Sequence, residues 1–106
     1  MSNLQRIALV LFGAMASSAV AQEDLERGHA IVKANCGACH AIESEGVSPL
    51  PEAPLFRTLG ERYPVADLEE ALAEGILTGH PAMPELSFEP DDIAAIIAYL
   101  ESLQKS

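Results

Sequence analysis

The pentapeptide Cys36-Gly37-Ala38-Cys39-His40 constrains this chain more than any other feature of its sequence. On a helical turn Cys36 and Cys39 stand three residues apart and His40 follows four residues after Cys36, so the three side chains project toward one side. Two thiols and an imidazole in this arrangement can hold a haem, the thiols as thioethers to its vinyl groups and the imidazole as an iron ligand. The sequence therefore predicts one covalently bound haem c.

Other uses of a C-x-x-C pair were weighed against haem attachment. Outside the cytoplasm the pair can form a disulfide or a thioredoxin-like redox centre. A thioredoxin-like fold requires strands, and no convincing strand pattern is present. A structural zinc site needs four ligands, whereas the chain has two cysteines, and His29, His40 and His80 are spaced unlike those of any common zinc finger. Haem attachment is the interpretation that the spacing favours.

The amino-terminal segment has the three parts of a secretory signal peptide. Arg6 supplies a positive charge, residues 7–16 form a mostly apolar run, and a small-x-small cleavage site ends at Ala21. A membrane-spanning helix would need about 20 apolar residues, and this run is about half as long. We therefore expect a leader over residues 1–21, a single mature domain over residues 22–106, and export to the periplasm without stable membrane insertion.

The charge balance limits the partners that the chain can bind. The whole sequence has 6 Lys and Arg against 16 Asp and Glu, a formal net charge of −10. Removing Arg6 with the leader leaves five basic against 16 acidic residues, a formal charge of −11. Nucleic acids and anionic membranes repel such a chain, so the expected partners are redox proteins that dock through a basic patch.

Three helices, separated by loops that contain Pro and Gly, are expected in the mature chain. The first begins with Asp24 as its N-cap and runs into the cysteine motif, the second opens with Pro64 and ends at Gly75, and the third opens with Pro90. Their inward-facing stripes are Leu25, Gly28, Val32 and Asn35, then Leu68, Ala71 and Leu72, then Ile93, Ile96, Ile97, Leu100 and Leu103. A short helical turn over residues 56–60 is also expected, and the fold class is all-α.

The sixth iron ligand is expected to be Met83, which is the only methionine of the predicted mature chain. A thioether is a soft, neutral ligand that suits low-spin haem, and a Met/His pair raises the reduction potential. Pro81 and Pro84 restrict the backbone on both sides of Met83. The alternatives are a core-filling methionine, ligation by His80, or ligation by His29, which is expected to face water on the first helix.

The remaining site residues follow from the needs of a bound haem. The second ring nitrogen of His40 should donate to a backbone carbonyl, which would fix the tautomer. Residues 41–53 are expected to form a loop, and the backbone carbonyl of Pro54 at its end is the expected acceptor for the His40 N–H. Arg57, Arg62 and Tyr63 are the available partners for the haem propionates, although solvation at the surface is the simpler explanation for each of them.

Taken together, these residues resemble class I cytochromes c, specifically the small bacterial monohaem carriers, over essentially the whole mature chain. The matching residues are Gly28 and Val32 in the first helix, Cys36, Cys39 and His40 in the haem motif, the proximal-side Pro54, the axial Met83 with Pro84, and Ile96 with Tyr99 on the last helix. The resemblance implies three to four helices wrapped around one haem, with Ile96 and Tyr99 crossing the first helix at Gly28. Val32 stands where an aromatic is common, and the family's frequent tryptophan is missing.

The expected function is one-electron transfer by a monomeric periplasmic carrier. With both axial positions filled by the protein, no iron position is open to a substrate, so an enzyme is not expected. One alternative is a haem c subunit or tethered acceptor of a periplasmic dehydrogenase complex, which should bury a larger apolar surface. Another is a gas-binding or peroxidase-like haem protein, should Met83 not ligate the iron.

Overall fold

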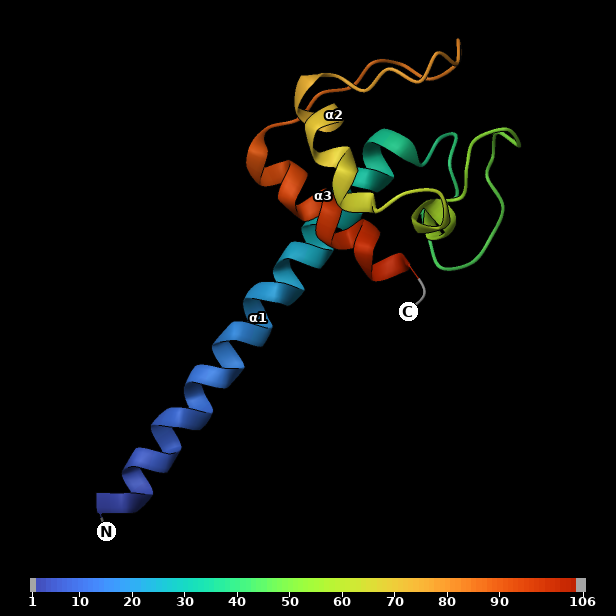
Figure 1. Cartoon of the computed structure of the whole chain (residues 1–106). Coiled ribbons are helices and arrows are strands. Elements are labelled where there is room, and N and C mark those ends of the chain that lie inside the picture. Colours follow the sequence, from blue (N-terminus) through green and yellow to red (C-terminus); the bar gives the residue numbers. More distant parts are fainter. Residues whose placement is uncertain (1, 105–106) are drawn as a thin grey trace.

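The computed structural model describes the backbone of residues 2–104 and the side chains of residues 19–104. Over this range it contains helices and no strand, which confirms the all-α fold class (Figure 1). The elements in chain order are the α-helix α1 (Ser2–Cys36), the 3₁₀ helices η1 (Phe56–Glu61) and η2 (Val65–Asp67), and the α-helices α2 (Leu68–Glu74) and α3 (Pro90–Leu103).

Helices α1 and α3 cross at Gly28, and the crossing depends on the absence of a side chain there. A Cβ atom at Gly28 would overlap the carbonyl oxygen of Ala95 and would lie 2.9 Å from the Cβ of Tyr99. Ala95 and Tyr99 are four residues apart, so they stack on one face of α3. The family resemblance had pointed to Ile96 with Tyr99. Ile96 is instead buried in the adjoining core, and Ala95 makes the closest approach.

A single apolar core joins all the helices. Val32, at 1% exposure, is its most completely buried large residue, so an aliphatic side chain fills the position where an aromatic is common in the family. The other members of the core are Ile42, Leu59, Val65, Leu72, Ile93, Ile96, Tyr99 and Leu100. The carboxyl end of α3 is tied to η1 by Gln104, whose Nε2 donates to Phe56 O at 2.8 Å and whose Oε1 accepts from the Gly60 N–H at 2.8 Å.

The second and third helices follow their predicted boundaries closely. Pro64 precedes η2 in an extended conformation, with ψ of 128°, so it lies just before the helical segment instead of within it. Helix α2 ends at Glu74, and Gly75 follows with a φ of +112°, which glycine adopts without strain. Helix α3 has Pro90 in its first turn, as predicted. The expected turn over residues 56–60 is η1.

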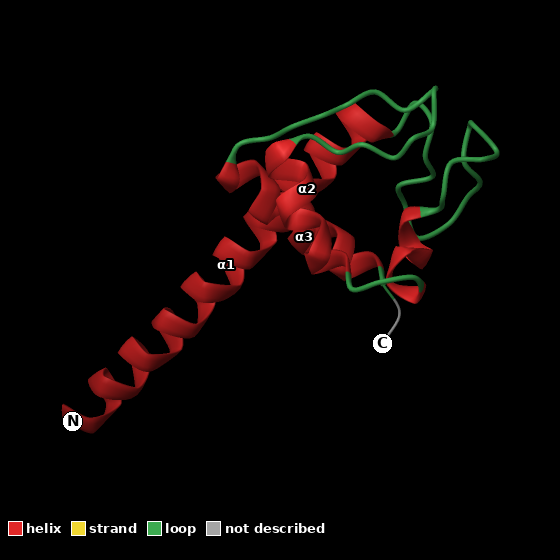
Figure 2. Cartoon of the chain, turned by 45° about the horizontal axis from the view of Figure 1, so that its top comes forward, coloured by secondary structure: helices red, strands yellow, loops and turns green. Residues whose placement is uncertain are grey.

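The start of α1 differs from the prediction. Asp24 was expected to be an N-cap, but it lies inside a continuous helix that begins at Ser2 and projects from the rest of the molecule (Figure 2). No Gly or Pro occurs between residues 14 and 27, so nothing in the local sequence interrupts the helix there. The leader (residues 1–21) lies almost wholly outside the residues whose side chains are described, and its removal stays a prediction. Among the described residues, no helix combines the length and apolarity needed to cross a membrane.

Two long loops complete the fold, one between α1 and η1 and the other between α2 and α3. Figure 2 shows both on the side of the molecule remote from the amino terminus. The limbs of the second loop are joined by the hydrogen bond from the Ile76 N–H to Leu86 O, at 3.0 Å, and Phe88 fixes its end by donating to Leu72 O at 2.9 Å. The first loop contains Pro54, and the second contains Met83.

Candidate functional site

The cysteine motif continues α1 as a tight turn. The His40 N–H donates to Cys36 O at 3.0 Å, and the Cys39 N–H donates to the same oxygen at 3.3 Å. Both cysteines are free thiols and half-buried. A Cβ on Gly37 would lie 2.7 Å from Lys33 O, so this position favours glycine over any residue with a side chain. The turn therefore keeps the two thiols and the imidazole within one helical turn, as the spacing predicts.

The thiol chemistry of Cys36 differs from that of a redox-active pair. Burial raises the pKa of the Cys36 thiol from 9.0 to about 11. Thioredoxin-like C-x-x-C pairs do the reverse, because their first cysteine must be a thiolate near neutral pH. The shift at Cys36 is therefore opposite in direction to that of a catalytic dithiol pair.

His40 has one ring nitrogen occupied and one free. Its Nδ1 lies 2.8 Å from Pro54 O, which confirms the predicted hydrogen bond. A carbonyl oxygen can only accept, so Nδ1 carries the proton and Nε2 keeps the lone pair. Nε2 is therefore the nitrogen that can bind a metal, and the hydrogen bond from Nδ1 holds the ring in one orientation.

The ring of His40 also packs against Phe56, a contact that the sequence did not indicate. The two ring centroids are 4.7 Å apart, with an angle of 39° between the ring planes. Phe56 is positioned by its own N–H, which donates to Ala41 O at 3.0 Å. The start of η1 was predicted as a helical turn, but nothing in its residue types showed that it would fold back onto the histidine.

Ser48 is a second residue that sequence reasoning missed. It is the buried polar residue of the first loop, at 8% exposure. Its hydroxyl accepts from the Ala41 N–H at 3.0 Å and donates to Ala53 O at 2.8 Å. A serine in a loop gives no periodic signal, so only the folded chain shows that this hydroxyl joins the two ends of the loop.

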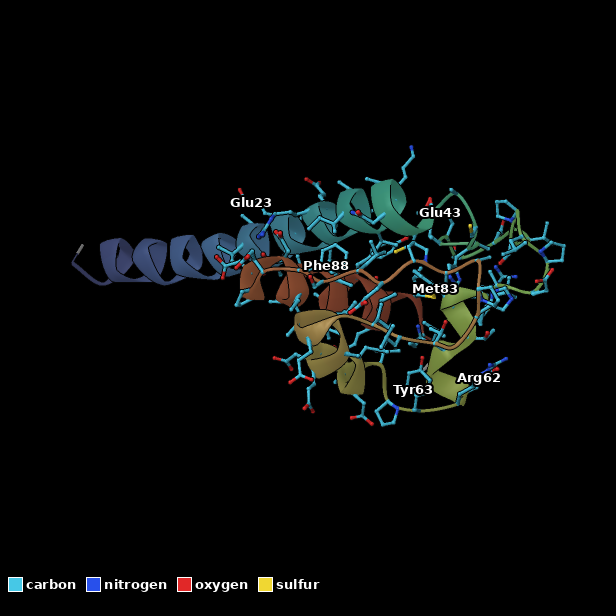
Figure 3. The ribbon with its side chains drawn as sticks, turned by 90° about the horizontal axis from the view of Figure 1, so that it is seen from above. Glu23, Glu43, Arg62, Tyr63, Met83 and Phe88 are labelled. Atoms are coloured by element: carbon cyan, nitrogen blue, oxygen red, sulfur yellow. The ribbon has the colours of Figure 1, made fainter. Side chains whose placement is uncertain are left out.

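Met83 comes from the second loop and is half-buried. Its N–H donates to His80 O at 3.1 Å, which makes a turn at the tip of the loop. Figure 3 shows Met83 within the outline of this loop, toward the end of the molecule where α1 finishes. The tip meets the first loop through His80 Nε2 and Glu52 Oε2, which are 3.2 Å apart. The fold thus brings the loop of Met83 against the loop that precedes Pro54.

The two other histidines are engaged elsewhere. His80 Nδ1 accepts from the Ala82 N–H at 3.2 Å, so its Nε2 carries the proton and donates to Glu52. No lone pair of His80 is then free in this arrangement. His29 has Nε2 only 2.8 Å from Glu43 Oε1 and packs beside Tyr99, while its side chain remains 37% exposed. His29 is therefore half-buried and only partly faces water, and it has a carboxylate partner that was not predicted.

The candidate propionate residues are spread around η1. Arg57 Nη1 donates to Gly46 O at 2.8 Å, so part of this guanidinium already braces the first loop. Arg62 and Tyr63 follow η1 and are exposed, as Figure 3 shows for this side of the molecule. The role of these three residues as partners of the haem propionates stays a prediction.

Comparison with known proteins decides the family. The sequence model of the cytochrome c family, described as "Cytochrome c", matches residues 25–104. The chain belongs to the cytochrome c family. A protein of Synechocystis sp. (strain ATCC 27184 / PCC 6803 / Kazusa) described as "Cytochrome c-553-like" is 29% identical over 80 residues, which cover 76% of this chain and 70% of that protein. No solved structure matches the chain.

The cofactor of this cytochrome c is covalently bound haem c, and the residues present fit it. Two thiols that form no disulfide stand on one turn with an imidazole whose free nitrogen is Nε2. Among the described residues, no group of three or more His, Cys, Asp or Glu side chains is arranged to hold a metal ion directly. The motif offers the thioether and imidazole chemistry that haem c requires.

Proposed function

We propose that this cytochrome c is a monomeric periplasmic one-electron carrier, with thioethers to haem at Cys36 and Cys39 and axial iron ligands from His40 and Met83. The observation that carries the proposal is the bond from His40 Nδ1 to Pro54 O, at 2.8 Å. It supports ligation because a histidine that binds iron through Nε2 needs its other nitrogen to donate to an acceptor.

The role of each ligand follows from its chemistry. Bound haem supplies a reversible one-electron couple. The neutral thioether of Met83 favours the reduced iron and so raises the potential. With protein groups on both faces, no iron position is open to a substrate, so electron transfer without bond formation is the expected activity and an enzyme is not.

The partner is proposed to be a redox protein with a basic docking patch. After removal of the leader the formal charge is −11, from five basic and 16 acidic residues. Two of the five basic residues are already engaged, Arg27 with Asp92 Oδ1 and Arg57 with Gly46 O. The net field of the mature protein therefore attracts a basic partner and repels an acidic one.

Replacement of Met83 tests the proposal. In Met83→Ala we expect the far-red sulfur-to-iron band of the oxidised protein to disappear, the potential to fall, and carbon monoxide to bind the reduced iron. Axial ligands move haem potentials over about 0.8 V, so the effect of this change should be large. The matched control is Leu77→Ala, which removes an exposed side chain from the same loop.

His80 must be tested together with Met83, because it lies three residues away and could turn to the vacant position. If carbon monoxide binds to Met83→Ala/His80→Ala and not to the single variant, His80 is a substitute ligand in the absence of Met83. A far-red band unchanged in Met83→Ala means that this methionine only packs, and the proposed ligation is then wrong. Ready binding of carbon monoxide by the reduced unmodified protein would instead support a gas-binding haem protein.

A further inference from the structure

We infer that the Ser48 hydroxyl is a positioning group for the axial histidine, because it fixes the hydrogen bond between His40 and Pro54. The inference rests on the proposed ligation of iron by His40. Ser48 touches neither partner of that hydrogen bond directly. It holds the chain neighbours of both.

Two hydrogen bonds of the Ser48 hydroxyl join the two ends of the first loop, beside the bond between His40 and Pro54. Ala41, which donates to Ser48 Oγ at 3.0 Å, is the residue after His40. Ala53, which accepts from Ser48 Oγ at 2.8 Å, is the residue before Pro54. The loop between them is exposed over residues 43–47, so these bonds hold the two neighbouring backbones at the spacing that places Pro54 O at 2.8 Å from His40 Nδ1.

The burial of Ser48 makes its hydroxyl difficult to replace. The residue is 8% exposed, and Ala41 is 7% exposed, so water has little access to either group. Without the hydroxyl, the Ala41 N–H and the Ala53 carbonyl would each need a new partner or would remain unpaired, which is costly for a buried polar group. We expect the loop ends to move apart to solvate these groups, and the bond between His40 and Pro54 then lengthens.

The consequence reaches the iron through the basicity of His40. Donation from Nδ1 makes the imidazole a more basic ligand. A more basic imidazole favours the oxidised, more positively charged iron. Weakening the bond to Pro54 therefore makes the oxidised state less favourable, and the reduction potential should rise when the Ser48 hydroxyl is removed.

The experiment compares Ser48→Ala with Ser48→Thr in the haem-loaded mature protein. Ser44→Ala, which alters an exposed serine of the same loop, is the matched control. The readouts are the hydrogen-exchange rate of the His40 Nδ1–H, measured by NMR of the reduced protein, and the reduction potential. In Ser48→Ala we expect the reduction potential to rise and the exchange of the His40 Nδ1–H to become faster by about tenfold. A tenfold change corresponds to the loss of one hydrogen bond from the local free energy of opening.

Ser48→Thr keeps a hydroxyl and should return both readouts toward those of the unmodified protein. Equal changes in Ser48→Ala and Ser48→Thr would show that the hydroxyl is not responsible and would overturn the inference. So would a Ser48→Ala protein that is less stable but has an unchanged exchange rate and potential. Failure of the proposed function looks different, because the unmodified protein would then lack the NMR signals of an iron-bound His40 ring before any variant is made.

Discussion

Tyr99 connects the last helix to the chain just after the haem motif. Its hydroxyl lies 2.7 Å from Ile42 O and 2.9 Å from Glu43 Oε1, while its ring lies beside His29. The hydrogen bond from Tyr99, followed by the bond and charge of His29, lowers the pKa of Glu43 below its usual value of 4.5. Burial and the neighbouring carboxylate raise the pKa of Tyr99 well above its usual value. The two acids thus titrate further apart than they would in isolation.

Tyr99→Phe should therefore raise the pKa of Glu43 toward 4.5, because the hydrogen bond from Tyr99 is the largest single cause of the lowering. An NMR titration of the Glu43 carboxyl measures the change, and a pKa that does not rise in Tyr99→Phe would contradict this role of the tyrosine. The lowered pKa means that Glu43 contributes stability above about pH 4.5, which is lost as pH falls through the folded-state value. The raised pKa of Tyr99 contributes stability below about pH 10, which is lost as pH rises toward its folded-state value.

At the scale of the helices, the crossing of α1 and α3 is the most demanding contact. Gly28→Ala should destabilise the haem-loaded protein by about 1–3 kcal/mol or more, because the new Cβ would overlap the Ala95 carbonyl. Alanine is the better helix former by about 1 kcal/mol, so any destabilisation must come from the crossing. Chemical unfolding measures the change. Ala30→Ser, on the exposed side of α1, is the control and should alter stability by less than about 0.5 kcal/mol.

The sequence alone predicted those helices whose starts, ends and apolar faces depend on neighbouring residues. Pro90 and the spacing of apolar residues predicted α3, and Gly75 marked the end of α2, because a helix start, a helix end and an apolar stripe each depend on neighbouring residues. The start of α1 was wrong because Asp24 fits an N-cap only if the helix begins there. The preceding residues, read as a leader, have the composition to continue the same helix.

The residues of the candidate site were likewise predictable where their roles depend on nearby sequence. The spacing of the cysteines and His40 is local, and the proline-rich run suggested Pro54 correctly as the partner of His40. Ser48 and Phe56 were missed because their roles depend on residues 5 to 16 positions away that the loop brings together, as the bonds to Ala41 and Ala53 and the ring contact with His40 show. A single sequence carries no signal for such contacts when the residue types are common in any loop.

At the scale of the whole molecule, net charge should govern encounters with small redox reagents. We expect the electron-transfer rate with a cationic complex, hexaammineruthenium, to fall as salt rises, because the formal charge of −10 on the chain is screened over a Debye length of about 10 Å at 0.1 M. The rate with an anionic complex, hexacyanoferrate, should rise over the same range. Stopped-flow absorbance measures both. Rates that do not change with salt in either case would show that the haem edge lies outside the influence of the acidic surface.

The continuity of α1 bears on how the protein matures. Cleavage after Ala21 would leave a helix that begins at Gln22, and Glu23 and Asp24 would move from the middle of a helix into a first turn. Negative charges in a first turn stabilise a helix by about 0.3–1 kcal/mol each, since the N–H groups there have no partners within the helix. They also offset the positive amino group that the cut creates. If the chain is cut there, the helix that carries the haem motif therefore keeps a favourable first turn of its own.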